Sequence, residues 1–462
     1  MKDRLEPVLI FVAATFYYSM LSAFRYTWLF GSGDSGDWLA SAKVWFVPQI
    51  YGSPFFITVA KIVNLFPGDL PANMTFFLSI IPAALSIALI YKVVYNLTGD
   101  ILKARLSSLI MMGATILTTQ AIIVEEYSFV LLMFCTALYF YSVNKHNWTV
   151  VFLGLAGAVH IIAVPIAFIF FVAHFRDMKY WAKKIPLYIV FGILPYGLIL
   201  FLMWADTPRW LAGELSLATI KDYLSNTSFV GRLSLLEAPA RLFYTACFML
   251  VTFGAAIIPA FREGIKRASP LYVALFLTAC FSVWMYATNL DWTTYTFLIY
   301  SIPCVAILAA VGITRKEQYG VVLIALVLIV SNFFLYNVER LDNADPIATT
   351  FYNETMSLPD GSLILTPGGG FFTMGLFHVI TDGKDVSLVY LADEKRMAQH
   401  GYQEWLKWAQ SEYGYVGDNS MEIVSNSDKP VYFVDTVYTD DWSAVYELEQ
   451  HSTYYKKVVG IK

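Results

Sequence analysis

The chain has 462 residues, of which 58% are hydrophobic, 17% are aromatic and only 14% are charged. Soluble domains carry charge on about a quarter of their residues, whereas apolar runs of about 18 residues, long enough to cross ~30 Å of hydrocarbon, recur along most of this sequence. The composition excludes an ordinary soluble protein, and the lack of a basic stripe argues against nucleic-acid binding. We therefore predict a polytopic α-helical membrane protein.

The net charge of −4 is unevenly distributed along the chain. Residues 341–462 hold 8 Lys or Arg and 18 Asp or Glu, a net charge of −10, whereas residues 1–340 hold 23 and 17, a net charge of +6. The acidic segment is also the more polar one. We predict a membrane domain over residues 1–340 and a soluble domain over residues 341–462.

Ten apolar runs are predicted to enter the membrane. They cover residues 7–29, 74–95, 106–123, 127–143, 149–175, 186–204, 241–260, 270–287, 295–313 and 319–337. Short loops rich in Lys and Arg stay on the cytoplasmic side, which places the N-terminus inside. The same rule places the loop 30–73, the segment 205–240 and the C-terminal domain on the extracytoplasmic side, in a prokaryotic plasma membrane or in the endoplasmic reticulum.

The run 149–175 does not fit one simple span. Lys145 and Arg176 flank it, and both are predicted to lie inside, yet two full spans need about 40 residues. A short helical hairpin that turns near His160 resolves the conflict, and the alternative is a single span with one loop that breaks the charge rule. We favour the hairpin, which gives about 11 helices in the membrane domain.

The stretch "FGSGDSGDWLASAKVWF" places Asp34 and Asp37 in a glycine-rich turn after the first run. If a helix begins near Ser35, the acids meet its first turn, where the positive end of the helix dipole stabilises carboxylates. Simple helix capping would explain one acid. It does not explain the following ~35-residue loop with its own apolar stretch, "PFFITVAKIVNLF", which predicts a partly helical roof over a site.

Three further ionisable residues interrupt apolar sequence. Glu125 and Glu126, in "IIVEEYSF", separate two runs, and His160 lies in "GLAGAVHIIAVP". Ionisable residues at membrane depth are costly and are functional candidates by default. We interpret Glu125 as such a candidate and Glu126 as part of a hydrophilic turn, whereas for His160 a buried core histidine and a site residue are equally good interpretations.

Two later extracytoplasmic segments also carry charge. Asp206 and Arg209 lie between tryptophans in "MWADTPRW", and Asp291 lies in "NLDW". Interfacial tryptophan is commonly only an anchor, and Asp291 is equally well an ordinary loop residue. Arg209 is the stronger indication, because a guanidinium group binds phosphate with two parallel hydrogen bonds.

Two other features point to structure rather than to chemistry. The cysteines lack metal-ligand spacing and are predicted to be small core residues: Cys135, Cys247, Cys280 and Cys304. In the acidic segment, strand-like "SLILTP", "VSLVYL" and "VYFVDT" bracket the helix-like "EKRMAQHGYQEWLKWAQ". This alternation predicts a small α/β domain.

The chain resembles a known family in several of these stretches. The segment from "GDSGDWLASAKVWFVPQIYGSP" to "FFLSIIPAALS" resembles the first outer loop and second span of the GT-C membrane glycosyltransferases, in particular the protein O-mannosyltransferase-like branch with an Asp-Ser-Gly-Glu motif. "TTQAIIVEEYSF", "GLAGAVHII", "MWADTP", "NLDWTTYTFLIYSIP" and "LPDGSLILTPGGGFFTMG" resemble later segments of that branch, in the same order. Asp37 replaces the motif's glutamate, and "PQIYGSP" replaces its His-Pro-Pro-Gly-Tyr-Pro stretch.

The resemblance implies an inverting glycosyltransferase that takes a hexose such as mannose from a polyprenyl-phosphate or dolichol-phosphate donor. The acceptor would be a hydroxyl of a protein Ser or Thr or of a glycan. Asp34 is then the candidate general base, and Asp37 orients the acceptor or holds a metal ion. The leaving phosphate needs a cation, either Arg209 or a divalent ion (Mg²⁺ or Mn²⁺) with Asp34 and Asp37 as its candidate ligands.

The remaining candidates shape the donor pocket or contact its phosphate: Glu125, His160, Asp206 and Asp291. A transporter or flippase is the principal alternative, in which acids on the outer face couple transport to an ion. The sequence lacks the paired repeats and matched broken helices typical of such proteins. A receptor that binds its partner through the C-terminal domain is a further alternative.

Overall fold

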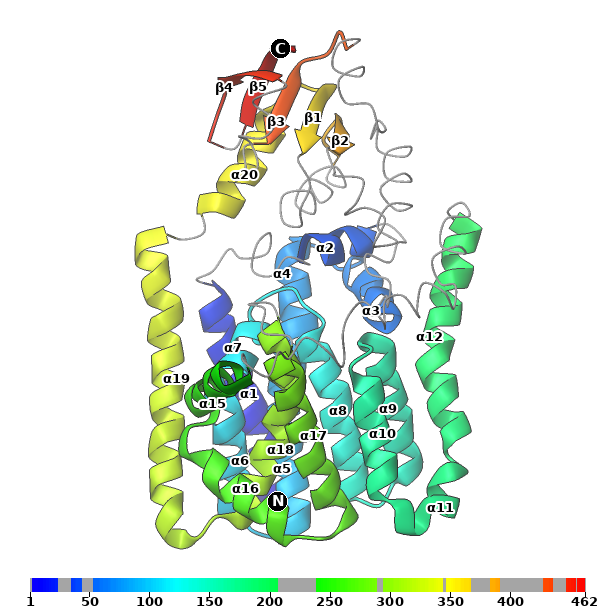
Figure 1. The fold of residues 1–462 in the computed structure, drawn as a ribbon, viewed down its shortest axis with the longest axis vertical. Helices are drawn as coiled ribbons and strands as arrows, with labels where there is room; N and C mark the ends of the chain where they lie inside the picture. Colours follow the sequence, from blue (N-terminus) through cyan, green and yellow to red (C-terminus); the bar gives the residue numbers. More distant parts are fainter. Residues whose placement is uncertain are drawn as a thin grey trace.

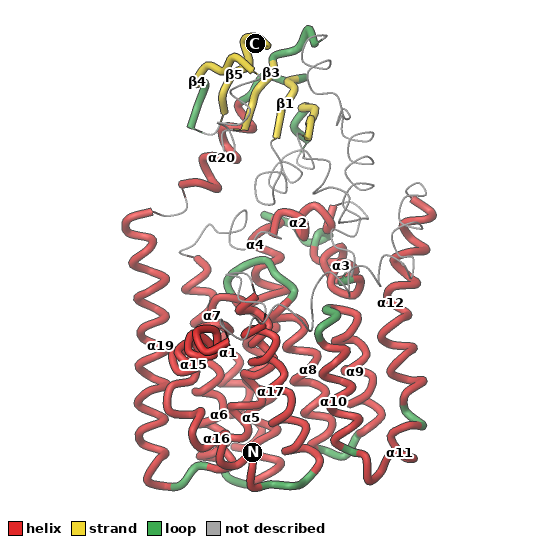
Figure 2. Tube along the Cα trace, viewed as in Figure 1, coloured by secondary structure: helices red, strands yellow, loops and turns green. Residues whose placement is uncertain are grey.

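The protein is a bundle of helices with a small β-sheet beyond one end (Figure 1). The computed structural model describes residues 2–23, 35–43, 53–206, 238–288, 294–343, 346–366, 383–390, 427–434, 446–453 and 455–461. The helices run lengthwise through the bundle and the strands lie together beyond it (Figure 2). We call the end nearest the sheet the α2 end, after the helix that lies there, and the other the opposite end.

The first half of the bundle contains the helices that follow the N-terminus. They are α1 (Lys2–Ala23), α2 (Ser35–Lys43), α3 (Pro54–Val63), α4 (Leu70–Met74), the π-helix η1 (Thr75–Ile80), α5 (Ile81–Thr98), α6 (Ile101–Gly113), α7 (Thr115–Ala121), α8 (Tyr127–Ser142), α9 (His146–Val159) and α10 (Ala163–Ala173). A helix does begin at Ser35, and "PFFITVAKIV" is helical, as the sequence predicts. Both α2 and α3 lie across the α2 end of the bundle (Figure 1).

The second half completes the bundle. It contains the 3₁₀ turn η2 (Phe175–Asp177), α11 (Met178–Ala182), α12 (Ile185–Asp206), α15 (Ala238–Phe253), the 3₁₀ turn η3 (Gly254–Ala256), α16 (Ile257–Lys266), α17 (Pro270–Thr288), the 3₁₀ helix η4 (Thr294–Tyr300), α18 (Ser301–Gly312), α19 (Arg315–Asn343) and α20 (Pro346–Ser357). Helix α18 is buried along almost its whole length, because its neighbours α5, α6, α16 and α17 surround it.

Several helices are suited to a membrane by length and apolar composition. In the described part of the chain four are sufficient on their own: Leu5–Ser22, Leu70–Thr98, Pro270–Ala287 and Arg315–Phe334. Counting each of two sharply bent helix pairs as one span raises the number to six. Six more apolar helices are shorter, with 10–17 residues, and pack among the long ones.

The predicted hairpin is confirmed. Helices α9 and α10 are separated by a turn at 160–162, and the chain doubles back. The ring of His146, at the start of α9, lies 5.2 Å from that of Trp181, which follows α10. Tyr141 Oη and His174 Nε2 are 2.8 Å apart at the same end. With 14 and 11 residues the two helices span about 21 and 16 Å, too short to cross the bilayer.

The predicted span 241–260 is wrong as a single helix. Helices α15 and α16 are bent by 112° where η3 joins them. Gly254 has a φ of +53°, a left-handed conformation that glycine adopts without strain, and a Cβ there would lie 2.3 Å from Ile324 Cγ2. The apolar pattern continues through this position, so hydropathy alone does not reveal the bend.

A second bend, of 66°, separates α6 from α7. A break in a helix exposes backbone carbonyls that need partners away from water. Asn332 of α19 supplies one, because its Nδ2 donates to the Gly113 carbonyl at 3.1 Å and to Thr118 Oγ1 at 3.3 Å. Thr115 Oγ1 in turn donates to Asn332 Oδ1 at 3.0 Å. Asn332 therefore attaches α19 to the body of the bundle at the bend.

The sheet has five strands in the order β2–β1–β3–β5–β4. They are β1 (Ser362–Thr366), β2 (Val386–Tyr390), β3 (Val431–Val434), β4 (Tyr446–Gln450) and β5 (Tyr455–Ile461). Strands β1, β2 and β3 pair in parallel, whereas β5 pairs antiparallel with β3 and β4. The three predicted strands are confirmed, β4 and β5 were not anticipated, and the helix predicted over 394–410 lies outside the described residues.

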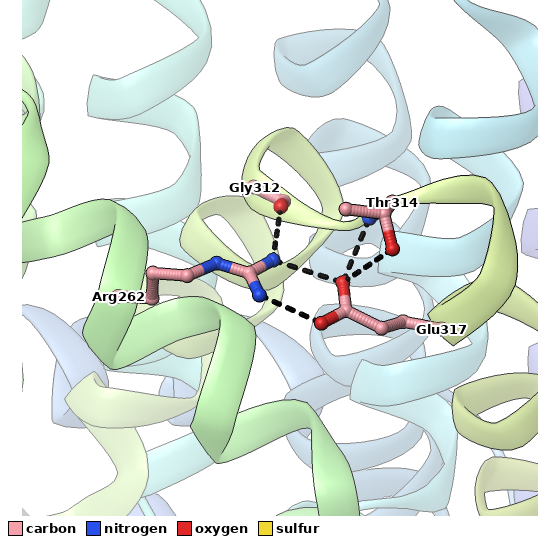
Figure 3. A network of polar contacts seen from close by, with 4 residues as sticks. All are labelled: Arg262, Gly312, Thr314 and Glu317. Atoms are coloured by element: carbon pink, nitrogen blue, oxygen red, sulfur yellow. Dashed lines mark hydrogen bonds and ion pairs between the residues drawn. The ribbon is translucent and has the colours of Figure 1, made fainter.

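At the opposite end, an ion pair between two partly exposed side chains fixes a turn. Arg262 of α16 donates to both carboxylate oxygens of Glu317, at 2.7 and 2.8 Å, and to the Gly312 carbonyl at 2.7 Å (Figure 3). The Thr314 backbone N–H and hydroxyl donate to Glu317 at 2.8 and 2.9 Å. This network fixes the turn between α18 and α19.

Two of the four cysteines correct the sequence-based prediction. Cys135 and Cys304 are buried, as predicted for small core residues, but Cys247 and Cys280 are exposed on the surface of the bundle. All four are free thiols. Apolar sequence around a cysteine does not distinguish a core position from one that faces lipid.

Candidate functional site

The candidate site is built on the irregular segment 122–126, which joins α7 to α8 at the α2 end. Buried backbone outside a helix must find other hydrogen-bond partners. Ser79 Oγ donates to the Ile123 carbonyl at 2.5 Å, and Ser35 Oγ of α2 donates to the Val124 carbonyl at 3.0 Å. These serines hold the segment that ends in Glu125 and Glu126.

Glu125 lies beneath α2 and has only 1% of its surface exposed. The indole Nε1 of Trp38, which is fully buried, donates to Glu125 Oε2 at 3.2 Å. Glu125 is therefore buried in the fold and is not part of a solvated turn. Its described contact is with a helix of the roof, and a contact with a donor phosphate stays a prediction.

Glu126 corrects the sequence-based interpretation. It was expected in a hydrophilic turn, but only 1% of its surface is exposed, and its Oε1 lies 3.8 Å from His160 Nε2. The low exposure shows that neighbouring parts of the fold cover the end of this segment. A turn between two hydrophobic runs is therefore not a solvated turn when other helices cover it.

His160 is held as a neutral imidazole. The Ile162 backbone N–H donates to His160 Nδ1 at 3.2 Å, so Nδ1 acts as an acceptor and Nε2 carries the proton. The Nε2–H side faces Glu126.

Aromatic rings line the pair. Tyr127 and Phe297 have ring centroids 5.2 and 6.4 Å from that of His160. Tyr300 is 1% exposed, and its hydroxyl has no hydrogen-bond partner among the described residues. It interacts electrostatically with Glu126. Polar groups from three separate elements thus meet in an apolar shell, which strengthens each electrostatic interaction.

The roof is fixed to the bundle through one face of α2. Ser35, Trp38, Leu39 and Ala42 are each 0% exposed and recur with the spacing of one helical face, and the neighbouring Ser41 is also 0% exposed. The Trp38 ring meets the Phe56 ring of α3 edge-on at 5.2 Å, and Phe56 meets Phe129 of α8 at 6.0 Å. An aromatic chain therefore joins α2, α3 and α8.

Lys43 is a further candidate that sequence reasoning missed. It is the last residue of α2 and is only partly buried. Burial lowers its pKa, and the opposing charge of Asp69 raises it. A lysine in this amphipathic helix, six residues after Asp37, is a second candidate cation for a phosphate group. Lys43 lies in the quoted stretch "FGSGDSGDWLASAKVWF", so the sequence already offered it as a candidate.

The structure describes the other predicted site residues only in part. Asp34, Arg209 and Asp291 lie outside the described residues. Asp37 belongs to the first turn of α2, and Asp206 is the last residue of α12, with only the backbone described at each. Among the predicted candidates, the structure therefore brings Glu125 and His160 to the α2 end, together with the helix that contains Asp37.

The described side chains offer no group of three or more His, Cys, Asp or Glu residues arranged to hold a metal ion. The metal ligands considered from the sequence, Asp34 and Asp37, have side chains outside that description. A divalent ion thus stays a prediction.

No protein-family model and no curated protein matches this sequence. Solved structures do resemble it. ArnT from Cupriavidus metallidurans in the apo state aligns with a TM-score of 0.62 and 11% identity, over 99% of this chain and 98% of that one. The Archaeoglobus fulgidus oligosaccharyltransferase complex with Zn and sulfate aligns with a TM-score of 0.50 and 12% identity, over 98% of this chain and 73% of that one.

The likeness to these two proteins shows the fold. The chain shares with both structures a helical membrane body and a C-terminal sheet, which confirms the predicted GT-C-like fold class. The narrower resemblance to the O-mannosyltransferase-like branch is not tested by this likeness.

Proposed function

We propose that the protein is a GT-C type glycosyltransferase that uses a lipid-linked sugar. The observation that carries the proposal is the fold, which matches ArnT over 99% of this chain. Both similar structures are glycosyltransferases. The buried Glu125, Glu126 and His160 beneath a helical roof add a polar site at one end of the bundle.

In its finer form the proposal names the substrates. The donor is a hexose, mannose first, on a polyprenyl or dolichyl phosphate, and the acceptor is a hydroxyl of a protein Ser or Thr or of a glycan. The reaction takes place on the extracytoplasmic or lumenal face of a multi-pass protein. The segment 341–462 would then lie on the same side and help to hold the acceptor.

The proposed chemistry is one inverting displacement. The acceptor oxygen forms a bond to the anomeric carbon, the bond from that carbon to the phosphate oxygen breaks, and polyprenyl phosphate leaves with the electron pair. Asp34 takes the acceptor proton as general base, and Asp37 orients the hydroxyl. Arg209 or Lys43 neutralises the leaving phosphate. If a divalent ion binds instead, Asp34 and Asp37 are its candidate ligands.

The remaining charged candidates have supporting roles in this proposal. Asp206 and Asp291 border the donor pocket, on segments predicted to face the same side as α2. His160 and Glu126 form the buried wall below the roof, with Nε2 and Oε1 3.8 Å apart. Because the imidazole is neutral, the wall is polar but adds no positive charge to that of Arg209 or Lys43.

The test uses membranes that contain the intact chain or Asp34→Asn. Each is given radiolabelled polyprenyl-phosphate mannose or glucose, and the label is followed into protein, glycan and lipid fractions. We expect transfer by the intact chain and a loss of at least 100-fold in the variant, since general-base catalysis contributes about 10²–10⁴-fold. Equal transfer by both proteins would contradict the assignment of Asp34.

Two further arms separate the alternatives. EDTA treatment followed by Mg²⁺ or Mn²⁺ reports whether transfer needs a divalent ion. Sealed proteoliposomes with labelled donor report whether the protein moves the lipid-linked sugar across the membrane. Movement without transfer would support the transporter or flippase and contradict the enzyme.

A further inference from the structure

Helix α2 is tied to the segment 122–126 by two hydrogen bonds from its buried face. Ser35, its first residue, donates to the Val124 carbonyl at 3.0 Å, and Trp38 donates to Glu125 Oε2 at 3.2 Å. All three side chains involved are buried, with exposures of 0% for Ser35, 0% for Trp38 and 1% for Glu125. The bonds come from adjacent turns of α2 and go to adjacent residues of the segment.

We propose that Glu125 is a positioning residue that fixes α2 through Trp38. This inference rests on the proposed function in one respect, since it assigns to α2 the task of presenting Asp34 and Asp37 to the donor. It differs from the sequence-based assignment of Glu125 to the donor pocket. In the present assignment the carboxylate serves the roof helix and does not touch the substrate.

The surroundings of Trp38 make a hydrogen-bond acceptor for its indole N–H necessary. Its ring is enclosed by Phe56, with Phe129 beyond, so water is excluded from the indole N–H. A buried donor without a partner is strongly unfavourable. A carboxylate is a stronger acceptor than a neutral group, and Glu125 therefore selects one placement of Trp38 and of the helix that contains it.

The position of α2 matters because the acids adjoin these contacts in sequence. Asp34 precedes Ser35 directly, and Asp37 precedes Trp38 directly. The buried side chains of α2 hold the helix against the bundle, so a shift of α2 moves the backbone of both acidic positions with it. A displacement of about 1 Å at a reacting group lowers the rate about 10²-fold.

The test compares three variants that separate the hydrogen bond from the charge. Trp38→Phe removes the donor but keeps a ring, Glu125→Gln keeps an acceptor but removes the charge, and Glu125→Ala removes both. Tyr17→Phe is the matched control, because the Tyr17 hydroxyl donates to the Ile329 carbonyl at 3.0 Å, between α1 and α19. Each protein is assayed for sugar transfer and for amide hydrogen exchange of residues 35–43.

We expect Trp38→Phe and Glu125→Ala to lower kcat about 10- to 100-fold with little change in the KM for the donor. Glu125→Gln is expected to stay within about threefold of the parent, and Tyr17→Phe to match it. The double variant Trp38→Phe/Glu125→Ala should lose no more than either single variant, because both act through one bond. Exchange of residues 35–43 should rise in Trp38→Phe and Glu125→Ala only.

Several outcomes would overturn the inference. Glu125→Gln as damaging as Glu125→Ala, with Trp38→Phe near the parent, would show that Glu125 acts by its charge. Unchanged exchange of residues 35–43 in Trp38→Phe would show that the bond does not hold α2. If the parent transfers no sugar, the proposed function fails, and the exchange data alone decide whether Glu125 fixes α2.

Discussion

The two ends of the bundle differ in how deeply their ionisable side chains are buried. At the opposite end Arg262 and Glu317 form a bidentate pair in which each side chain keeps about a third of its surface exposed, 32% and 33%. At the α2 end Glu126 and His160 are 1% and 3% exposed, and Glu126 Oε1 and His160 Nε2 remain 3.8 Å apart. The first arrangement closes a turn, whereas the second places ionisable groups where burial is unfavourable.

This difference indicates where the fold serves function. A buried ionisable pair adds little or nothing to stability compared with apolar residues of similar size, and such groups at membrane depth are usually functional. Exposed pairs that close turns have a sufficient structural explanation. The four predictions below test this division, from the largest expected effect to the smallest.

Glu126→Gln should separate activity from stability. The substitution keeps the shape of the side chain but removes its charge from an apolar shell, so we expect transfer to fall about 10- to 100-fold, in the range found for lost electrostatic stabilisation. The melting temperature should stay unchanged or rise. Transfer assays and thermal unfolding in detergent measure the two effects.

The matched control for Glu126→Gln is Glu317→Gln at the opposite end. It should lower the melting temperature slightly and leave transfer unchanged. If Glu126→Gln loses stability and activity in parallel, Glu126 is a structural residue and the division between the two ends fails.

Asn332→Leu tests the attachment of α19, which lies away from both ends. The variant leaves the Gly113 carbonyl and the Thr115 and Thr118 hydroxyls without their contacts to this side chain. An unsatisfied buried polar group destabilises a protein by roughly 1–3 kcal/mol, and we expect a loss of this size in thermal or denaturant unfolding. Phe334→Leu, at a position on the same helix that is 59% exposed, should show almost none.

Replacing His160 should weaken the α2 end. The Ile162 backbone N–H donates to His160 Nδ1 at 3.2 Å, and His160→Leu removes this acceptor. A buried donor without a partner destabilises a protein by roughly 1–3 kcal/mol, so we expect a lower melting temperature. Thermal unfolding in detergent measures the effect, and a melting temperature equal to that of the parent would contradict it.

The sequence predicted much of the fold because its strongest signals are local. Apolar length located most helices, the Lys and Arg residues beside 149–175 favoured the hairpin, and short strand-like runs identified β1, β2 and β3. The bend at Gly254 was missed because it depends on a left-handed backbone next to Ile324, a contact across the fold. Strands β4 and β5 were missed because Glu and Lys interrupt their apolar pattern.

The candidate site was less predictable than the fold. Glu125 and His160 stood out as ionisable residues in apolar sequence, but Glu126 was misread because its burial depends on helices distant in the sequence. Trp38 was not singled out in the sequence, and its contact with Glu125, 87 positions away, is seen only in the fold. Residue type can indicate that a site exists, but partners so far apart in sequence are found only from the fold.

Arg262→Met should have the smallest effect, and it completes the comparison of the two ends. The variant removes both hydrogen bonds to Glu317 and the one to the Gly312 carbonyl. Partly exposed ion pairs contribute little because water screens them, and Glu317 retains the Thr314 backbone N–H and hydroxyl. We expect a melting temperature slightly below that of the parent, with a smaller shift at high salt, and unchanged transfer. Lost transfer in this variant would show that the turn between α18 and α19 influences the site at the α2 end, and a purely structural role for the opposite end would then be wrong.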